Sequence, residues 1–384
     1  MRISGLTVLL CCCLVGTVRG DDDDVLLARA RRILDQAILI DGHNDLPWAV
    51  RERTGGDFAR YDIRRRLRFG HTDIPRLRAG GVKAQFWSVF VPVSYAEKGI
   101  AVRTTLEQFD VVHRMVARYG ETFELARSAA DVRRIAAAGK IACLIGVEGG
   151  HSIDNSLAVL RMYYKLGARY MTLTHSKNTD WADSCTDEPQ HGGLTEFGRK
   201  VVREMNRLGM LVDISHVSHD TMRDVLEVTR APVIASHSSA YAVAPFARNV
   251  PDDVLQKIRH NGGVVMVNFF SWFVHPEAAR RLAQGQRSGP MPQATIDHVL
   301  DHIDHIVQVA GVEHVGLGSD YDGIPAPPDG LEDVSTFPRL VAGLLRRGYS
   351  EEQIKLIVGG NVLRVLEQAE QVARRLNRRG DRSE

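Results

Sequence analysis

Cysteine is scarce in this chain, and most of it lies at one end. Of the 5 cysteines among 384 residues, three fall at positions 11–13, which leaves only Cys143 and Cys185 in the body of the sequence. A disulfide between these two is possible but not indicated, because Cys143 lies in an apolar run and Cys185 in a polar loop. With 44% hydrophobic residues, the chain is expected to hold together by one large apolar core.

The chain also lacks an excess of charge of either sign. Its 49 Lys and Arg residues nearly balance 47 Asp and Glu residues, for a formal charge of +2. A nucleic-acid partner would require a basic surface, so this balance excludes a broad footprint of that kind. A small molecule is the expected partner.

No apolar run is long enough to span a membrane. The first twenty residues carry Arg2, an apolar stretch at 6–15, and small residues at Val18 and Gly20, which predicts a signal peptide over 1–20. A transmembrane anchor is the alternative, but a span needs about 20 apolar residues. The C-terminal RRLNRRGDRSE is not the apolar tail of a lipid-anchor signal. We expect a secreted or periplasmic catalytic domain over 21–384.

Apolar, β-rich runs alternate with segments of helical periodicity, which is typical of an α/β fold. Eight such runs occur, at 37–42, 83–91, 141–147, 169–174, 210–215, 232–236, 263–269 and 314–318. The count predicts a single (β/α)8 TIM-type barrel with added N- and C-terminal helices at 24–36 and 351–376. Segment 276–293 is expected to be an exposed loop. A doubly wound open sheet also alternates in this way, but its site lies at one crevice.

Residues able to bind a metal follow several of these runs. His43 and Asp45 are two residues apart after the first run, a spacing that points both side chains to the same side of a strand. Glu148 follows the third run and could bridge two ions, while His216 and His237 follow the fifth and sixth. A loop hydrogen bond would explain the His-x-Asp pair alone, but core histidines have no reason to recur at strand ends. Imidazole and carboxylate ligands suit zinc, with manganese or cobalt as alternatives.

Three further residues have the chemistry that hydrolysis needs. A two-metal site makes hydroxide available from a bridging water, and Asp320, after the eighth run, is placed to move its proton to a leaving nitrogen. Asp322 would point the same way if the strand continued. His175, after the fourth run, could donate to an oxyanion, or else be another metal ligand or a loop contact. Arg248 could hold a substrate carboxylate, with a surface arginine as the alternative.

Other histidines look like ligands but are predicted to be surface residues. His298, His302 and His305 have metal-like spacing, yet they fall opposite the apolar stripe of their helix, which predicts a solvated face. His219 is expected in the first turn of the helix that follows His216.

The sequence resembles the membrane (renal) dipeptidase family of zinc peptidases with an amidohydrolase-type barrel. The resemblance rests on DGHNDLPW at 41–48 and on LIGVEGGHSID, YMTLTHSKN, APVIASHSSAY, RNVPDD and GSDYDG further along the chain. It implies that His43 and Asp45 bind one zinc, that His216 and His237 bind the other, and that Glu148 bridges them.

The resemblance also implies a substrate and the residues that bind it. Dipeptides, including some with a C-terminal D-residue, would be cleaved with His175 on the carbonyl, Arg248 on the terminal carboxylate and Asp320 as proton shuttle. A homodimer is also implied. Phe273 stands where a carboxylate-binding tyrosine is expected, and Ala244 and Pro276 replace disulfide cysteines, so the chain resembles a soluble, disulfide-poor branch.

Two other functions stay open at this point. One is an amidohydrolase acting on N-acyl amino acids or β-lactams, which retained amide hydrolysis without dipeptide cleavage would support. The other is a non-catalytic binding protein with this fold, although the intact ligand set argues against it.

Overall fold

Eight parallel strands close into a barrel in the computed structural model, which describes residues 18–286 and 288–378. In order around the barrel, each strand pairs with the next along the chain, and β1 pairs with the last. The barrel strands are β1 (Leu39–Asn44), β2 (Val82–Phe90), β4 (Ile141–Glu148), β5 (Ala168–Thr172), β6 (Leu211–Asp213), β7 (Ile234–Ala235), β8 (Val264–Val267) and β9 (Val315–Leu317). The predicted (β/α)8 barrel is confirmed, and each of the eight predicted runs overlaps one of its strands, with bounds that differ by no more than two residues at the strand ends that lie outside the runs.

A ninth strand, β3 (Phe123–Leu125), was not predicted because it is only 3 residues long. It pairs with the start of β4, whose later residues pair with β5, so β3 lies beside the barrel without interrupting it.

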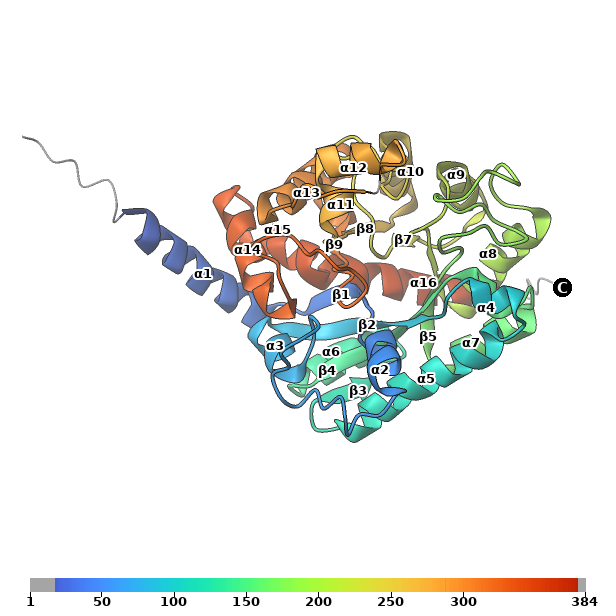
Figure 1. The fold of residues 1–384 in the computed structure, drawn as a ribbon, viewed down its shortest axis with the longest axis horizontal. Coiled ribbons are helices and arrows are strands. Elements are labelled where there is room, and N and C mark those ends of the chain that lie inside the picture. Colours follow the sequence, from blue (N-terminus) through green and yellow to red (C-terminus); the bar gives the residue numbers. More distant parts are fainter. Residues whose placement is uncertain (1–17, 287, 379–384) are drawn as a thin grey trace, which may run out of the picture.

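Helices surround the barrel on its outside, as Figure 1 shows. They are α1 (Val18–Gln36), α2 (Leu46–Thr54), α3 (Ile74–Ala79), α4 (Ser94–Glu97), α5 (Ala101–Arg118), α6 (Ala129–Ala137), α7 (Leu157–Leu166), α8 (Glu196–Leu208), α9 (His219–Val228), α10 (Asp252–Asn261), α11 (Ser271–Val274), α12 (Pro276–Ala283), α13 (Ile296–Ala310), α14 (Phe337–Arg346), α15 (Glu351–Lys355) and α16 (Asn361–Arg378). Short 3₁₀ turns η1 (Gly150–Ile153), η2 (Val312–His314) and η3 (Val334–Thr336) and the π-helical turn η4 (Leu356–Gly360) complete the elements.

The added terminal helices are confirmed. Helix α1 packs against α14 and α15, and its amino-terminal half extends away from the barrel in Figure 1. Of the predicted signal peptide, residues 1–17 lie outside the described residues and 18–20 belong to α1. The predicted helix at 351–376 is divided by η4, where the backbone of Gly359 leaves the helical conformation. A side chain is excluded there, because a Cβ on Gly359 would lie 2.0 Å from the carbonyl oxygen of Ile38. No helix in the described part of the chain is both long and apolar enough to cross a membrane.

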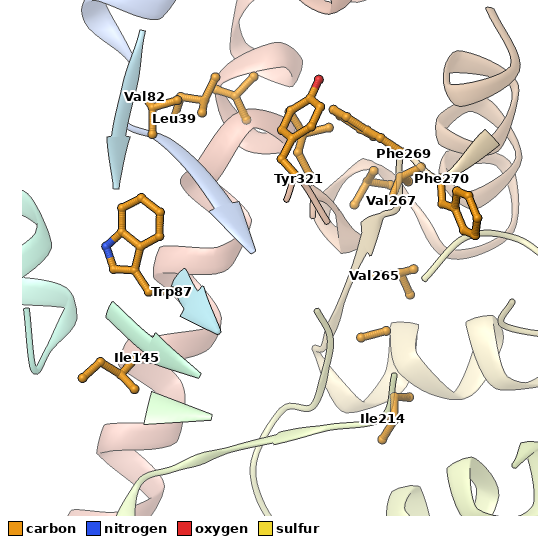
Figure 2. Packing of buried hydrophobic residues seen from close by; sticks show 14 of the residues in the cluster. Leu39, Val82, Trp87, Ile145, Ile214, Val265, Val267, Phe269, Phe270 and Tyr321 are labelled. Atoms are coloured by element: carbon orange, nitrogen blue, oxygen red, sulfur yellow. The ribbon is translucent and has the colours of Figure 1, made fainter. Parts of the chain in front are cut away.

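Two layers of apolar side chains fill the molecule. Phe86, Leu144 and Met266 on the strands form one cluster together with α16. Their neighbours Trp87, Ile145 and Val265 form a second and larger cluster with the surrounding helices, and Figure 2 shows part of it. This alternation follows from the period of two in a β-strand. Cys143 lies in the larger cluster, and both it and Cys185 are free thiols.

Segment 276–293 was predicted to be an exposed loop, and this is wrong for its first half. Helix α12 begins at Pro276, a residue suited to a first helical turn, and the ring of His275 accepts hydrogen bonds from the backbone there. Ala278, Ala279 and Leu282 are buried. The Gly and Gln residues that suggested a loop belong to the part after the helix.

The predicted solvated face of α13 is wrong for His302. Its ring is fully buried, accepting a hydrogen bond from the backbone of Ala240 at 3.0 Å and donating one to the carbonyl of Val274 at 3.1 Å. Burial lowers the pKa of His302 to about 3. This side of α13 is covered by α11 and by the chain after β7, a tertiary contact that helical periodicity does not reveal. His298 and His305 are half-buried.

His302→Leu is therefore expected to lower the free energy of unfolding by about 2 kcal/mol or more, since it leaves a buried donor and a buried acceptor unpaired. His305→Leu is the control, because His305 contacts only the half-exposed Asp252 and should cost under about 1 kcal/mol. Denaturant unfolding of both variants measures the difference. Equal losses would contradict the structural role of His302.

Candidate metal centre

The barrel brings the five predicted ligand residues to one place. His43 lies in β1, Asp45 begins helix α2, Glu148 ends β4, and His216 and His237 follow β6 and β7. Three groups of three have ligand atoms that all lie within 4.8 Å of one another, and one of them joins Asp320 to His43 and His237. The other two groups share Glu148: His43, Asp45 and Glu148 form one, and Glu148, His216 and His237 form the other. All of these residues lie at the carboxyl ends of the strands, where barrel enzymes place their catalytic residues.

Glu148 belongs to two of these groups because its two oxygens face different partners. Oε1 lies 3.1 Å from Nε2 of His216 and 3.4 Å from Nε2 of His237. Oε2 lies 3.6 Å from Nε2 of His43 and accepts a hydrogen bond from Ser88 at 3.3 Å. A carboxylate in this position can give one oxygen to each of two cations.

The protonation states suit metal binding, which requires ionised carboxylates and neutral imidazoles. Burial lowers the pKa of His216 and of His237 well below the ordinary imidazole value. Burial opposes the charge on Glu148, but the neighbouring imidazoles hold its pKa well below the ordinary carboxyl value. His216, His237 and Glu148 are thus in the form that gives a lone pair to a metal.

The site also holds surplus negative charge. Burial, together with the carboxylates of Asp45 and Glu148, raises the pKa of Asp320 to about 7. Burial disfavours a charged His43, yet Tyr170 and the same two carboxylates raise its pKa well above the ordinary value. Nε2 of His43 and Oδ1 of Asp45 are buried without a hydrogen-bond partner. Cations would balance this charge and occupy these free ligand atoms.

A hydrogen bond between His43 and Tyr170 fixes the ring of His43. The tyrosine hydroxyl lies 2.7 Å from Nδ1 of His43 and donates its own proton to the carbonyl of Gly42 at 3.2 Å. The hydroxyl oxygen is therefore left to accept the proton on Nδ1. This tautomer directs the lone pair of Nε2 towards Glu148, as expected for a ligand held by a second partner.

A longer relay fixes His237 in the same way. Ser236 Oγ donates to Oδ2 of Asp213 at 2.6 Å and lies 2.7 Å from Nδ1 of His237, whose proton it accepts. Thr172 donates to the same carboxylate oxygen at 2.5 Å. The lone pair of His237 Nε2 consequently faces Glu148.

Two predicted functional residues have left-handed backbones. His216 has φ 65° and Asp320 has φ 66°, values that non-glycine residues adopt only when their surroundings hold them there. The carbonyl of His216 accepts hydrogen bonds from Cys185 N and Thr174 Oγ1, at 2.8 and 3.0 Å. The left-handed backbone at these two positions thus sets the direction in which their side chains leave the chain.

Asp320 lies beside the proposed ligands, with 9% of its surface exposed. Its Oδ2 accepts a hydrogen bond from Asn268 at 2.9 Å, and its backbone donates to the carbonyl of His43 at 3.1 Å. Strand β9 ends at Leu317, before either aspartate, and Asp322 lines the same cavity as Asp320. Its Oδ1 accepts a hydrogen bond from the backbone of His71 at 2.8 Å, and its Oδ2 is buried without a partner.

Arg248 is buried, so the surface alternative is wrong. Its guanidinium donates to Ser238 Oγ at 3.1 Å and to the carbonyl of His237 at 3.3 Å, while Nε has no partner. It lies over the ring of Phe273, with Cζ 5.4 Å from the ring centre. A buried cation with an unused donor is suited to an anionic ligand.

A cavity of about 360 Å³ joins these residues. Glu148, His175, Arg248 and Asp320 all line it, together with Phe273. His175 stacks on His216 with ring centres 4.4 Å apart, and its Nε2 lies 3.8 Å from Glu148 Oε1. His219, as predicted, begins α9, where its ring contacts the carbonyl of Asn249.

Sequence reasoning missed the residues that orient the ligands. Tyr170, Asp213, Ser236 and Asn268 are ordinary members or neighbours of strands. The one available signal was their position in the sequence. Each of them lies on a barrel strand or just after one, close to the strand ends that carry the predicted site residues. Nothing in their spacing indicated which atoms they contact.

The fold and the site together are those of a metal-dependent hydrolase built on a barrel. Comparison with known proteins identifies the family. Residues 27–380 match the family described as membrane dipeptidase (peptidase family M19). The chain belongs to this family and is a metallopeptidase of the dipeptidase class.

Solved structures are similar to this chain over most of its length. A metallo peptidase from Rhodobacter sphaeroides, liganded with a phosphinate mimic of the dipeptide L-Ala-D-Ala, is 29% identical with a TM-score of 0.75, covering 87% of this chain and 99% of its own. The metallo peptidase dipeptidase AC of family M19 is 30% identical with a TM-score of 0.75, covering 87% and 98%. The probable dipeptidase PvdM from Pseudomonas aeruginosa is similar in fold, with 23% identity, a TM-score of 0.81 and coverage of 91% and 100%.

The relay behind His237 can be tested by removing one hydroxyl. Ser236→Ala is expected to weaken metal binding by about 10- to 100-fold, because the ring loses the partner that sets its tautomer. Competition with a chromophoric chelator measures the affinity. Ser271→Ala is the matched control, since the Ser271 hydroxyl is buried without a partner. Equal affinity in both variants would contradict the orienting role of Ser236.

Proposed function

We propose that the protein is a zinc-dependent dipeptidase with two ions per chain. His43 and Asp45 bind one ion, His216 and His237 bind the other, and Glu148 bridges them. The observation that carries this proposal is the division of the Glu148 oxygens between His43 on one side and His216 and His237 on the other. Nitrogen and oxygen ligands without thiolates suit a catalytic zinc site.

Bound zinc would supply acidification of the attacking water and polarisation of the peptide carbonyl. Asp320 takes the proton released in the attack and passes it to the leaving amine. Its place in the wall of the cavity, next to His43 and His237, supports this role, because a carboxylate there is within reach of both the water and the leaving amine. Asn268 keeps the carboxylate oriented.

The remaining two residues hold the substrate. Arg248 binds the terminal carboxylate of the dipeptide, for which its buried guanidinium offers a free Nε donor. Burial lowers the pKa of His175, so its neutral ring can donate a hydrogen bond to the oxyanion that forms at the carbonyl. Both side chains line the cavity that Glu148 and Asp320 also reach.

The substrates include dipeptides with a C-terminal D-residue. This part of the proposal is supported by the phosphinate mimic of L-Ala-D-Ala bound to the Rhodobacter sphaeroides relative. Secretion through the segment at 1–20 and assembly as a homodimer complete the proposal, and both rest on the sequence and its resemblance.

Hydrolysis of a dipeptide panel by the purified protein tests the function. We expect cleavage of L-Ala-L-Ala or L-Ala-D-Ala that disappears after chelation and returns when zinc is added, because the ligand atoms cannot activate water without a metal. Release of free alanine is the measurement. An absence of cleavage by protein that contains its full complement of metal would overturn the dipeptidase assignment and favour another amide substrate.

Asp320→Asn tests the proton transfer separately. The amide is nearly the same size but cannot accept a proton, so kcat should fall by about 10²- to 10⁴-fold. Metal analysis of the same preparation should give the wild-type content, because Asp320 is not among the proposed ligands. Turnover near the wild-type rate would refute the proton-shuttle role, and loss of metal would make Asp320 a ligand instead.

A further inference from the structure

A second cavity lies beside the one at the metal centre. Its volume is about 440 Å³, and it shares His216, Arg248 and Phe273 with the first cavity. Those three residues form the boundary between the two spaces. The second cavity therefore lies directly next to the metal centre, on the other side of Arg248 and Phe273.

Large apolar side chains form much of the wall of this second cavity. Phe246 comes from the chain after β7, Trp272 and Phe273 from α11, and Leu282 from α12. Phe246 and Leu282 belong to a small apolar cluster separate from the main core, against which Trp272 and Phe273 pack. Phe246 and Phe273 stack with ring centres 5.3 Å apart. The wall is thus a packed aromatic surface.

Arg248 fixes where a substrate would enter this cavity. Its guanidinium is held by Ser238 and by the carbonyl of His237 while it lies over the Phe273 ring. In a dipeptide the terminal carboxylate and the side chain of the last residue are attached to the same carbon. A carboxylate on Arg248 therefore brings the C-terminal side chain to the boundary of the second cavity.

We propose that the second cavity binds the side chain of the C-terminal residue and selects large apolar side chains there. This inference rests on the proposed function, specifically on Arg248 as the carboxylate anchor. The cavity is much larger than a methyl group requires, so an alanine would leave most of the aromatic wall in contact with water. A leucine or phenylalanine side chain would cover it.

The polar residues at this cavity do not favour an acidic side chain. Lys177 already forms an ion pair with Asp187 at 2.9 Å. The hydroxyl of Thr186 donates to the carbonyl of Ser176 at 3.1 Å. Each of these two polar side chains thus already has a partner within the protein. An acidic substrate side chain would have to compete with those partners, whereas an apolar one would only cover the aromatic wall.

The test compares dipeptides that differ only at one end. We expect kcat/KM for L-Ala-D-Leu and L-Ala-D-Phe to exceed that for L-Ala-D-Ala by about tenfold or more, the discrimination expected when added carbon atoms enter an apolar pocket. L-Ala-D-Asp should be cleaved no better than L-Ala-D-Ala. The same series with L-residues at the C-terminus shows which configuration the cavity accepts.

Leu282→Trp assigns the preference to this cavity, because Leu282 lines the second cavity and not the first. The larger ring should fill the space and lower the ratio of kcat/KM for leucine over alanine at the C-terminal position by about tenfold. The ratio for L-Leu-D-Ala over L-Ala-D-Ala should not change. Ala283→Trp places the same ring on the exposed neighbouring position of α12 and is the matched control.

Leu282→Ala is a second variant, which adds no bulk. It should also lower the ratio of kcat/KM for leucine over alanine at the C-terminal position, because it removes apolar contact.

The outcomes separate this inference from the function on which it rests. Cleavage of the panel with equal rates for alanine and leucine, or an unchanged ratio in both Leu282 variants, would overturn the apolar subsite while leaving the dipeptidase intact. A preference for L-Ala-D-Asp would overturn it in favour of an acidic side chain. Failure to cleave any dipeptide would instead remove the proposed function.

Discussion

Four imidazole rings converge on one buried carboxylate, and the rest of the site depends on this arrangement. Nε2 atoms of His43, His175, His216 and His237 lie between 3.1 and 3.8 Å from an oxygen of Glu148. A buried carboxylate is costly unless cations or donors surround it. The closed barrel meets this requirement: β4 pairs with β2 and β5, and the ends of β1, β5, β6 and β7 bring in the four histidines.

Much of the fold could be predicted because the barrel strands are apolar runs and the outer helices have a clear periodicity. The errors occur where tertiary contacts override these patterns. His302 lies on the polar side of α13, yet a second layer of structure covers it. The first turn of α12 begins with a proline, and its buried Ala278 and Ala279 carry too weak an apolar signal to separate it from the adjacent loop.

The proposed ligands could be selected from the sequence because each stands just where an apolar run ends, and the barrel brings those ends together. The residues behind them could not be selected from spacing. Tyr170 on β5 contacts His43 on β1, although these strands are not neighbours, and Asp213 on β6 reaches His237 only through the hydroxyl of Ser236. Phe273 was singled out as a departure from the family pattern. Only the structure reveals that its ring supports Arg248 and separates two cavities.

The central claim is that Glu148 is shared by two cations. Anomalous diffraction from crystals of the zinc-loaded protein, recorded on both sides of the zinc absorption edge, tests it most directly. The account predicts two anomalous peaks, one beside each oxygen of Glu148, with His43 and Asp45 at the first peak and His216 and His237 at the second. A single peak, or two peaks of which only one contacts Glu148, would contradict it.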